Sequence, residues 1–246
     1  MTDFNTYSNT LPDPNNPIGN AGQSGANQTT AGLGYSSVAL TSEHKILNSR
    51  TNSGRLVSRE LSAHQWKISI GYNPMVRDDF ERINAFLVQK RGSMTPFFVS
   101  LPQYKAPQDT AFASFVASNT FTNSVTGAAG TTNLLISHSS YSSSNGVVKP
   151  GDIFTITDDS NSNHKKVYQV TRVEKTLEKL SGATAIASNA LLIHFNPPLQ
   201  RAVAANKNIN FNNPLFRVTM KGDTTEYELN TDNLYSFSLK LEEAQA

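Results

Sequence analysis

The chain has 246 residues, of which 16% are charged, with a formal net charge of +2 and no cysteine. The absence of cysteine excludes disulfides, thiolate nucleophiles and cysteine-ligated zinc. The small net charge and the lack of a basic patch argue against a protein that grips nucleic acid or an anionic membrane. Serine, threonine and asparagine replace the missing charges, which favours many short strands and turns over long helices.

The first 36 residues are rich in Asn, Gly, Ser, Thr and Pro and contain few large apolar groups. Such a segment cannot bury enough surface to offset its ordering entropy, so we expect a flexible N-terminal arm over residues 1–36. Whether the arm stays disordered or orders on a neighbouring subunit is open. We also find no signal peptide and no apolar run near the ~20 residues of a membrane span, so we expect folding in a cytoplasm and no membrane partner.

Residues 42–72 carry the first strand signals. Two short strands, Ser42–Asn48 and Arg55–Leu61, are expected on either side of a turn at residues 52–54. The next segment, His64–Tyr72, alternates apolar and polar side chains, which predicts a half-buried strand. Trp66, the one tryptophan, is then expected to anchor a core.

A helix should follow this strand. Asn73 can cap it, Pro74 suits its first position, and Gly92 can end it. Its predicted buried stripe consists of Val76, Phe80, Ile83, Phe86 and Leu87. A strand over Thr95–Leu101 comes next.

The remainder of the chain has β character. A linker over residues 103–110 precedes a possible strand at Phe112–Phe121. Clearer strands are expected at 134–137, 152–157, 166–173, 191–195, 215–220, 225–230 and 235–241. The last of these resembles the first strands in style, so residues 37–107 and 206–246 are predicted to form one β domain, with residues 108–205 inserted as a second β domain.

No local motif of catalysis or metal binding is present. The five histidines, His44, His64, His138, His164 and His194, have no metal-ligand spacing. Asp158, Asp159, Asn161 and Asn163 partly match a calcium loop, but His164 replaces its glycine and Val170 its final glutamate. Glu242 and Glu243 are expected to be solvated. We therefore predict no enzyme and no catalytic, cofactor or metal residues, although a site assembled from distant residues is not excluded.

Three stretches together carry a family resemblance. Residues 49–102 contain, in order, a strand with a central Trp (HQWKISIGY), a helix with an apolar stripe (INAFLVQKRG) and a PFF strand ending in Leu-Pro. This order resembles the N-terminal part of phage distal tail and tail-tube-like proteins. VKPGDIFTI (148–156) with KKVYQVT (165–171) resembles the small β module inside such proteins, and LYSFSLKLEEA (234–244) resembles their closing strand.

The resemblance implies a mainly β fold: a tail-tube-like split β-barrel or sandwich with one flanking α-helix, plus an inserted small β-barrel-like domain. It implies a structural virion protein that forms a ring, usually a hexamer, at the distal end of the phage tail tube, as a baseplate hub or tube initiator. Its partners would be itself and other tail tube and baseplate proteins, after assembly in the host cytoplasm. DNA would only pass through the lumen, without specific contacts.

Two other classes of function remain open. A carbohydrate-binding β-sandwich module of a tail adhesin would need an exposed aromatic platform. A cell-wall hydrolase would need paired carboxylates in a cleft.

Overall fold

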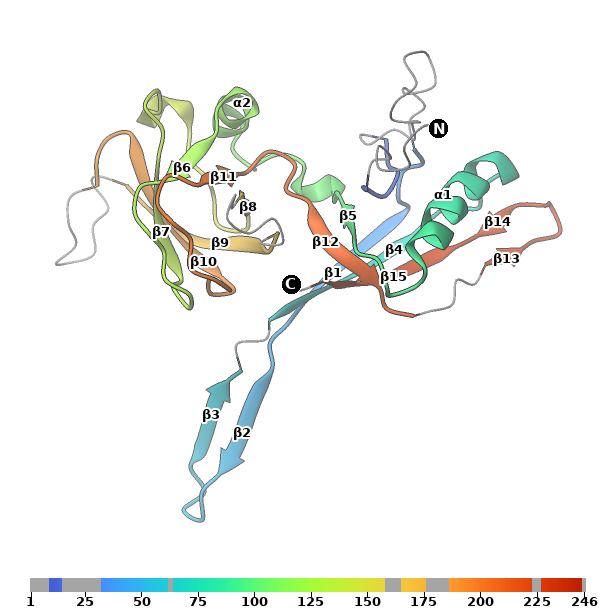
Figure 1. Cartoon of the computed structure of the whole chain (residues 1–246), viewed down its shortest axis with the longest axis horizontal. Helices are drawn as coiled ribbons and strands as arrows, with labels where there is room; N and C mark the ends of the chain where they lie inside the picture. The colour runs from blue at the N-terminus through green and yellow to red at the C-terminus, as the bar shows by residue number, and fades with distance from the viewer. Residues whose placement is uncertain are drawn as a thin grey trace. The chain divides into compact units, whose positions relative to one another are not determined.

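The computed structural model describes residues 9–14, 32–61, 64–157, 165–175, 186–222 and 227–244. Its contacts divide the chain into two compact units. Unit 1 comprises Met1–Ile46, Ala63–Ser100 and Arg217–Gln245, and unit 2 comprises Leu47–Ser62 and Leu101–Phe216. The predicted mainly β class is confirmed, because the described residues form fifteen strands and two α-helices (Figure 1). Neither helix has the length and apolar character needed to cross a bilayer.

Unit 1 is built on a five-stranded sheet with the order β1-β4-β15-β12-β5. The strands are β1 (Ser37–Glu43), β4 (Gln65–Gly71), β15 (Ser238–Glu243), β12 (Phe216–Met220) and β5 (Phe97–Val99). The central strand β4 pairs antiparallel with β1 on one side and β15 on the other, so Ile68 lies opposite both Leu40 and Leu241. Trp66, Ile68 and Ile70 are buried, as their alternation predicts.

Helix α1 (Arg77–Lys90) packs on this sheet. Phe80 stacks on Tyr235 and meets the edge of Phe237, and Phe86 meets the edge of Phe97 on β5. The helix begins three residues later than predicted, after Val76, which makes no side-chain cap. Pro74 therefore lies outside the helix, and Val76 is solvent-exposed instead of buried.

The other predicted stripe positions of α1 are fully or partly buried, as expected. Phe80, Ile83 and Leu87 are buried, and Phe86 is half-buried. Arg91 ends the helix in the left-handed conformation, followed by Gly92, which also has a positive φ. The predicted end of the helix is thus confirmed.

Part of the N-terminal segment packs on unit 1. Thr10 bridges Phe98 in parallel, and backbone hydrogen bonds run from Leu11 to Phe98 and from Phe98 to Asn9. Leu11 is completely buried, and Lys90 donates to the Asn9 side chain at 2.5 Å. Residues 9–14 of the expected flexible arm are therefore packed on the unit, and residues 9–11 cover the β5 edge of the sheet.

Unit 1 also contains a short antiparallel pair, β13 (Glu228–Leu229) and β14 (Tyr235–Ser236). Met75 and Tyr235 exchange both backbone hydrogen bonds, which fixes this pair beside the segment that leads into α1. The single strand predicted at 235–241 is therefore divided into β14 and β15.

A second two-stranded sheet consists of β2 (Ile46–Arg50) and β3 (Leu56–Glu60). Its turn is closed by hydrogen bonds from Thr51 N–H to Arg55 and from Gly54 N–H to Thr51. The predicted turn is confirmed, whereas the predicted strand at 42–48 is divided between β1 and β2.

Unit 2 contains a closed barrel of six antiparallel strands in the order β10-β7-β6-β11-β8-β9. They are β6 (Phe121–Asn123), β7 (Asn133–Ser137), β8 (Ile153–Thr157), β9 (Val167–Glu174), β10 (Ala190–Asn196) and β11 (Asn208–Asn210). Aromatic side chains fill it: Phe154 stacks on Tyr168, and Phe195 meets both of them edge-on.

Helix α2 (Thr110–Ser118) replaces the strand predicted at 112–121. Asp109 caps it by accepting the Phe112 N–H at 3.0 Å. Phe112, Phe115 and Val116 are buried at helical spacing in the barrel core. The prediction was wrong because a short apolar run fits a buried strand and a buried helix equally well.

The barrel extends beyond the predicted insertion of 108–205. Strand β11 pairs with β6 and β8, and Phe211 belongs to the barrel core. Lys105 and Asn213 are joined by a backbone hydrogen bond of 2.8 Å, which closes the segment. Lys105 and Asn213 thus close a segment within the Leu101–Phe216 part of unit 2, and its folding as an inserted domain stays a prediction.

Candidate functional site

No group of three or more His, Asp or Glu side chains that could hold a metal ion occurs in the described part of the chain. The calcium-loop candidates Asp158, Asp159, Asn161 and Asn163, together with His164, lie outside the described residues.

Among the described residues of unit 1, Ser42 contacts two histidines, with its Oγ 3.3 Å from His44 Nε2 and closer to His64. Ser42 Oγ lies 2.8 Å from His64 Nε2, and the buried His64 ring packs edge-on against Trp66 and His44. His64 is thus packed between the rings of His44 and Trp66, where the end of β1 lies beside the start of β4. We interpret the pair as a packed corner of the sheet, since a hydroxyl–imidazole contact alone does not make a nucleophile site without a substrate cleft.

The barrel has a second polar cluster. Glu174 is 1% exposed, and its Oε1 lies 2.8 Å from His194 Nε2 and 3.3 Å from Arg172. The other carboxylate oxygen, Oε2, is buried without a hydrogen-bond partner among the described residues. A single carboxylate held by its strand neighbours is an ion pair within the sheet, and lacks the second carboxylate that glycoside hydrolysis uses.

Glu243 is not solvated as predicted. It continues the inward-facing positions Leu239 and Leu241 of β15, and it is buried. Its Oε2 accepts the Trp66 backbone N–H at 3.1 Å. This carboxylate is therefore part of the joint between β4 and β15. Glu242, its neighbour, is half-exposed and lies 3.7 Å from Lys221.

Two exposed apolar surfaces stand out from these structural clusters. The first, which we call the hairpin surface, belongs to β2 and β3. Every residue of β2 is exposed, and the large apolar side chains that reach solvent are Ile46, Leu47, Leu56 and Val57, together with Leu61 directly after β3. Because neighbouring strand residues point to opposite faces, Ile46 and Leu47 expose apolar groups on both faces of the ribbon.

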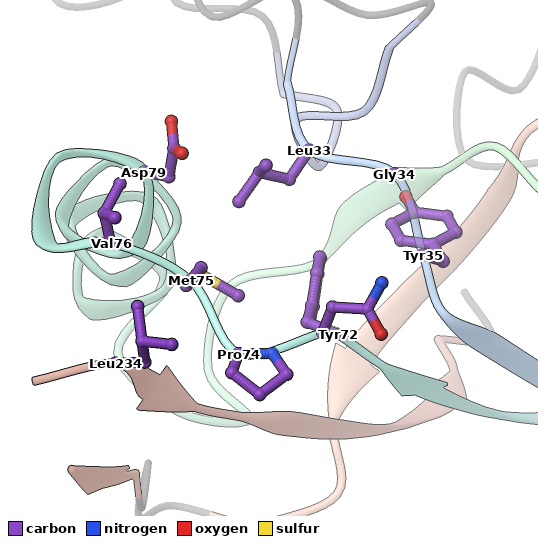
Figure 2. A pocket seen from close by; sticks show the side chains of 10 residues that line it. Leu33, Gly34, Tyr35, Tyr72, Pro74, Met75, Val76, Asp79 and Leu234 are labelled. Carbon is purple, nitrogen blue, oxygen red and sulfur yellow. The ribbon is translucent and has the colours of Figure 1, made fainter. Parts of the chain in front are cut away.

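The second surface is a groove of about 460 Å³ in unit 1 (Figure 2). Residues 33–35 form one wall, residues 72–76 and Asp79 form the opposite wall and floor, and Leu234 closes one end. The backbone pairing of Met75 with Tyr235 holds Leu234 beside the start of α1. Three segments far apart in the sequence thus create this groove.

Burial controls the chemistry of the two groove tyrosines. It raises the pKa of the Tyr35 phenol and of the Tyr72 phenol well above the usual range, and the Asp13 carboxylate adds to both shifts. Both phenol oxygens are buried and have no hydrogen-bond partner among the described residues. The tyrosines therefore stay neutral and offer ring surface, instead of hydroxyl groups, to the groove.

An apolar ledge continues the groove onto β13. Tyr227 packs against Phe80 and Tyr235, yet 52% of it is exposed, as is 53% of Leu229. With the exposed Val76, these side chains make an apolar patch of the kind that marks protein contact sites.

The barrel offers no comparable aromatic platform in its described residues. Its aromatic side chains are buried: Phe112, Phe115, Phe121, Tyr141, Phe154, Tyr168, Phe195 and Phe211. The feature that a sugar-binding module would need is therefore not found there.

The chain is similar to the distal tail protein pb9 of Escherichia phage T5. The two are 27% identical over 236 residues, which cover 95% of this chain and 98% of that protein. No protein-family model matches the chain. The resemblance to phage distal tail proteins is thus confirmed along nearly the whole length, including the inserted barrel.

The sequence did not reveal either apolar surface as a surface. The sequence predicts ordinary strands at β2 and β3. Their unusual feature is that no layer of the described chain covers them, and this is seen only in the structure. The groove depends on the backbone pairing of Met75 with Tyr235, which no local sequence pattern predicts.

Proposed function

We propose that this chain, a homologue of a phage distal tail protein, is a structural component of the tail that forms a ring at the distal end of the tail tube. The ring surrounds the DNA channel, docks other tail proteins and catalyses no reaction. It serves as a baseplate hub or tube initiator, and six is the number of copies that the resemblance suggests.

The observation that carries this proposal is the hairpin surface. An isolated two-stranded hairpin is marginally stable in water, and this one exposes five large apolar side chains. Burying these apolar groups on another protein surface would remove them from water and stabilise the hairpin.

A second support is the open edge of the unit 1 sheet. Strand β1 pairs only with β4 among the described residues, and Glu43 is its single charged residue. The opposite edge, β5, is covered by residues 9–11. An edge with few charges favours pairing with a neighbour, and a closed ring limits such pairing to a finite number of copies.

A protein that lines the DNA channel needs to bind DNA only weakly. DNA must slide through the lumen, so strong phosphate binding would be a disadvantage. A net charge of +2 over 246 residues agrees with a wall that DNA passes without being gripped.

The first test is the position of the chain in the particle. A small peptide tag at the C-terminus, detected with gold-labelled antibody in negative-stain images, should mark the distal end of each tail. Label along the tube, at the head junction, or on no part of the tail would overturn the proposal.

The second test concerns the hairpin surface. A variant with Leu47, Leu56 and Val57 changed to serine should fold normally, because exposed substitutions change stability by only about 0.5 kcal/mol. It should nevertheless fail to support tail assembly when it replaces the natural chain. The matched control is Val125→Ser, an exposed valine of unit 2, which should support assembly fully. Normal tails with the triple variant would show that the hairpin is not an assembly surface.

A further inference from the structure

We infer that the groove beside the start of α1 receives the β2–β3 hairpin of a second copy of this chain. The inference rests on the proposed ring and adds to it the two surfaces that meet between neighbours. The hairpin surface of one copy and the groove of the next would form each contact.

Apolar complementarity is the first argument. The hairpin presents exposed leucine, isoleucine and valine side chains that nothing in the described chain covers. The groove is lined by Leu33, Tyr35, Val76 and Leu234, with Tyr227 exposed nearby (Figure 2). Tyr72 and Met75 also line it but are largely buried. Joining the hairpin to the groove removes apolar area from water on both sides.

Charge complementarity is the second argument and selects this occupant. Residues 45–61 contain four basic residues, Lys45, Arg50, Arg55 and Arg59, and one acidic residue, Glu60. One acidic side chain, Asp79, lines the groove, and three more belong to the elements that form or adjoin it: Asp78 in the first turn of α1, and Glu228 and Asp232 on the β13–β14 pair and its turn.

The nearby basic residues do not cancel this negative border. Arg77 forms a salt bridge with Glu81 at 3.3 Å, and residues 227–236 contain no basic residue at all. A positive hairpin is therefore attracted to a negative groove, and two hairpins or two grooves repel one another.

The groove fits a chain segment better than a small molecule. A small-molecule site needs a few placed polar groups that orient the ligand. Here the two phenol oxygens are buried, Asn73 and Asp79 are the other polar side chains among the lining residues, and the groove is open to solvent. A strand that lies across the ledge and inserts one or two side chains needs only apolar surface and a charged rim.

The geometry of such a contact is also consistent with a ring. The hairpin and the groove are different surfaces, so each copy both gives and receives a contact. Head-to-tail contacts of this kind generate closed rings when the rotation between neighbours closes.

Disulfide trapping in assembled tails tests the inference directly. The chain has no cysteine, so Leu56→Cys and Val76→Cys can be introduced together without background. Tails assembled from this double variant are isolated and oxidised, and are then analysed on a non-reducing gel. We expect a ladder of linked chains from dimer upward, which collapses to monomer on reduction.

The controls use exposed residues away from the groove. Leu56→Cys paired with Val88→Cys, at the other end of α1, should give no ladder, nor should Val76→Cys paired with Val125→Cys. A panel with Leu47 or Val57 in place of Leu56, and with Leu234 in place of Val76, allows for the register of docking. If tails form but the whole panel gives no ladder, or the Val88 control links equally well, the inference is wrong while the ring proposal stands.

Charge reversal gives an independent readout. Asp78→Lys with Asp79→Lys should lower the yield of assembled tails by about tenfold or more, since like charges then meet. Combining it with Arg55→Glu and Arg59→Glu should restore the yield, whereas combining it with the exposed Arg201→Glu should not. Equal yields for both combinations would contradict the proposed pairing.

Discussion

The backbone N–H of Trp66 donates a hydrogen bond of 3.1 Å to Glu243, which is 177 residues away in the sequence. Both residues are buried. They lie where β4, which holds Trp66, pairs with β15, the last strand of the chain. The carboxylate therefore connects the two segments that flank the inserted barrel.

We predict that Glu243→Ala destabilises unit 1 by about 1–3 kcal/mol, because it leaves the buried Trp66 N–H without this acceptor. Urea unfolding followed by Trp66 fluorescence measures the change. Glu242→Ala, at the next and more exposed position, should cost less than about 1 kcal/mol. Equal losses for the two variants would mean that the buried contact contributes nothing.

Phe80 should be the most sensitive position of α1. It is 2% exposed and contacts Tyr227, Tyr235 and Phe237. We expect Phe80→Ala to lower the free energy of unfolding by roughly 3–5 kcal/mol. Val88→Ala on the exposed face should change it by less than about 0.5 kcal/mol. A loss near zero for Phe80→Ala would show that the helix is not packed on the sheet.

Alternation was the most reliable sequence signal, because half-buried strands impose it directly. It predicted β4 with Trp66, Ile68 and Ile70 inward. The same rule places Glu243 inward after Leu239 and Leu241, but the preference of charged residues for solvent led to the opposite prediction.

The errors arose where the outcome depends on tertiary structure. The run from Phe112 to Val116 suits either a strand or a helix, and its cap Asp109 was assigned to a linker. The start of α1 was placed too early because Met75 pairs with Tyr235 of β14 instead of joining the helix. Both apolar surfaces depend on which side chains remain uncovered, a property of the folded chain and not of its local pattern.

The inserted barrel should be removable. Lys105 and Asn213 are joined by a hydrogen bond, so a short Gly-Ser linker in place of residues 105–213 can connect the flanking segments. We expect the remaining chain to be soluble and to unfold cooperatively. A molten or insoluble product, as judged by circular dichroism and urea unfolding, would show that unit 1 requires the barrel to fold.

Tyr141 should make stability fall in strongly alkaline solution. Burial, helped by the Asp109 charge, raises the pKa of its phenol from 10.0 to about 12 in the folded chain. Between those two pH values the unfolded chain loses the proton while the folded chain keeps it, so the free energy of unfolding decreases as pH rises. Below pH 10 the phenol is neutral in both states and adds no pH dependence.

The matched variant is Tyr141→Phe. It loses the 2.8 Å hydrogen bond to the Gly146 carbonyl, which lowers stability at neutral pH by about 0.5–1.5 kcal/mol. Its stability should then decline less steeply than that of the natural chain between pH 10 and 12. Parallel curves for the two proteins would contradict the assigned shift.

The measurement that tests the central claim most directly is the fate of particles that lack this chain. Phage carrying a deletion of its coding sequence, grown with and without the chain supplied in trans, should be imaged by electron microscopy and assayed for DNA delivery. We predict that tails are absent or lack their distal structure without the chain, that DNA delivery is lost, and that the supplied chain restores both. Normal tails that still deliver DNA in its absence would contradict the structural-ring account.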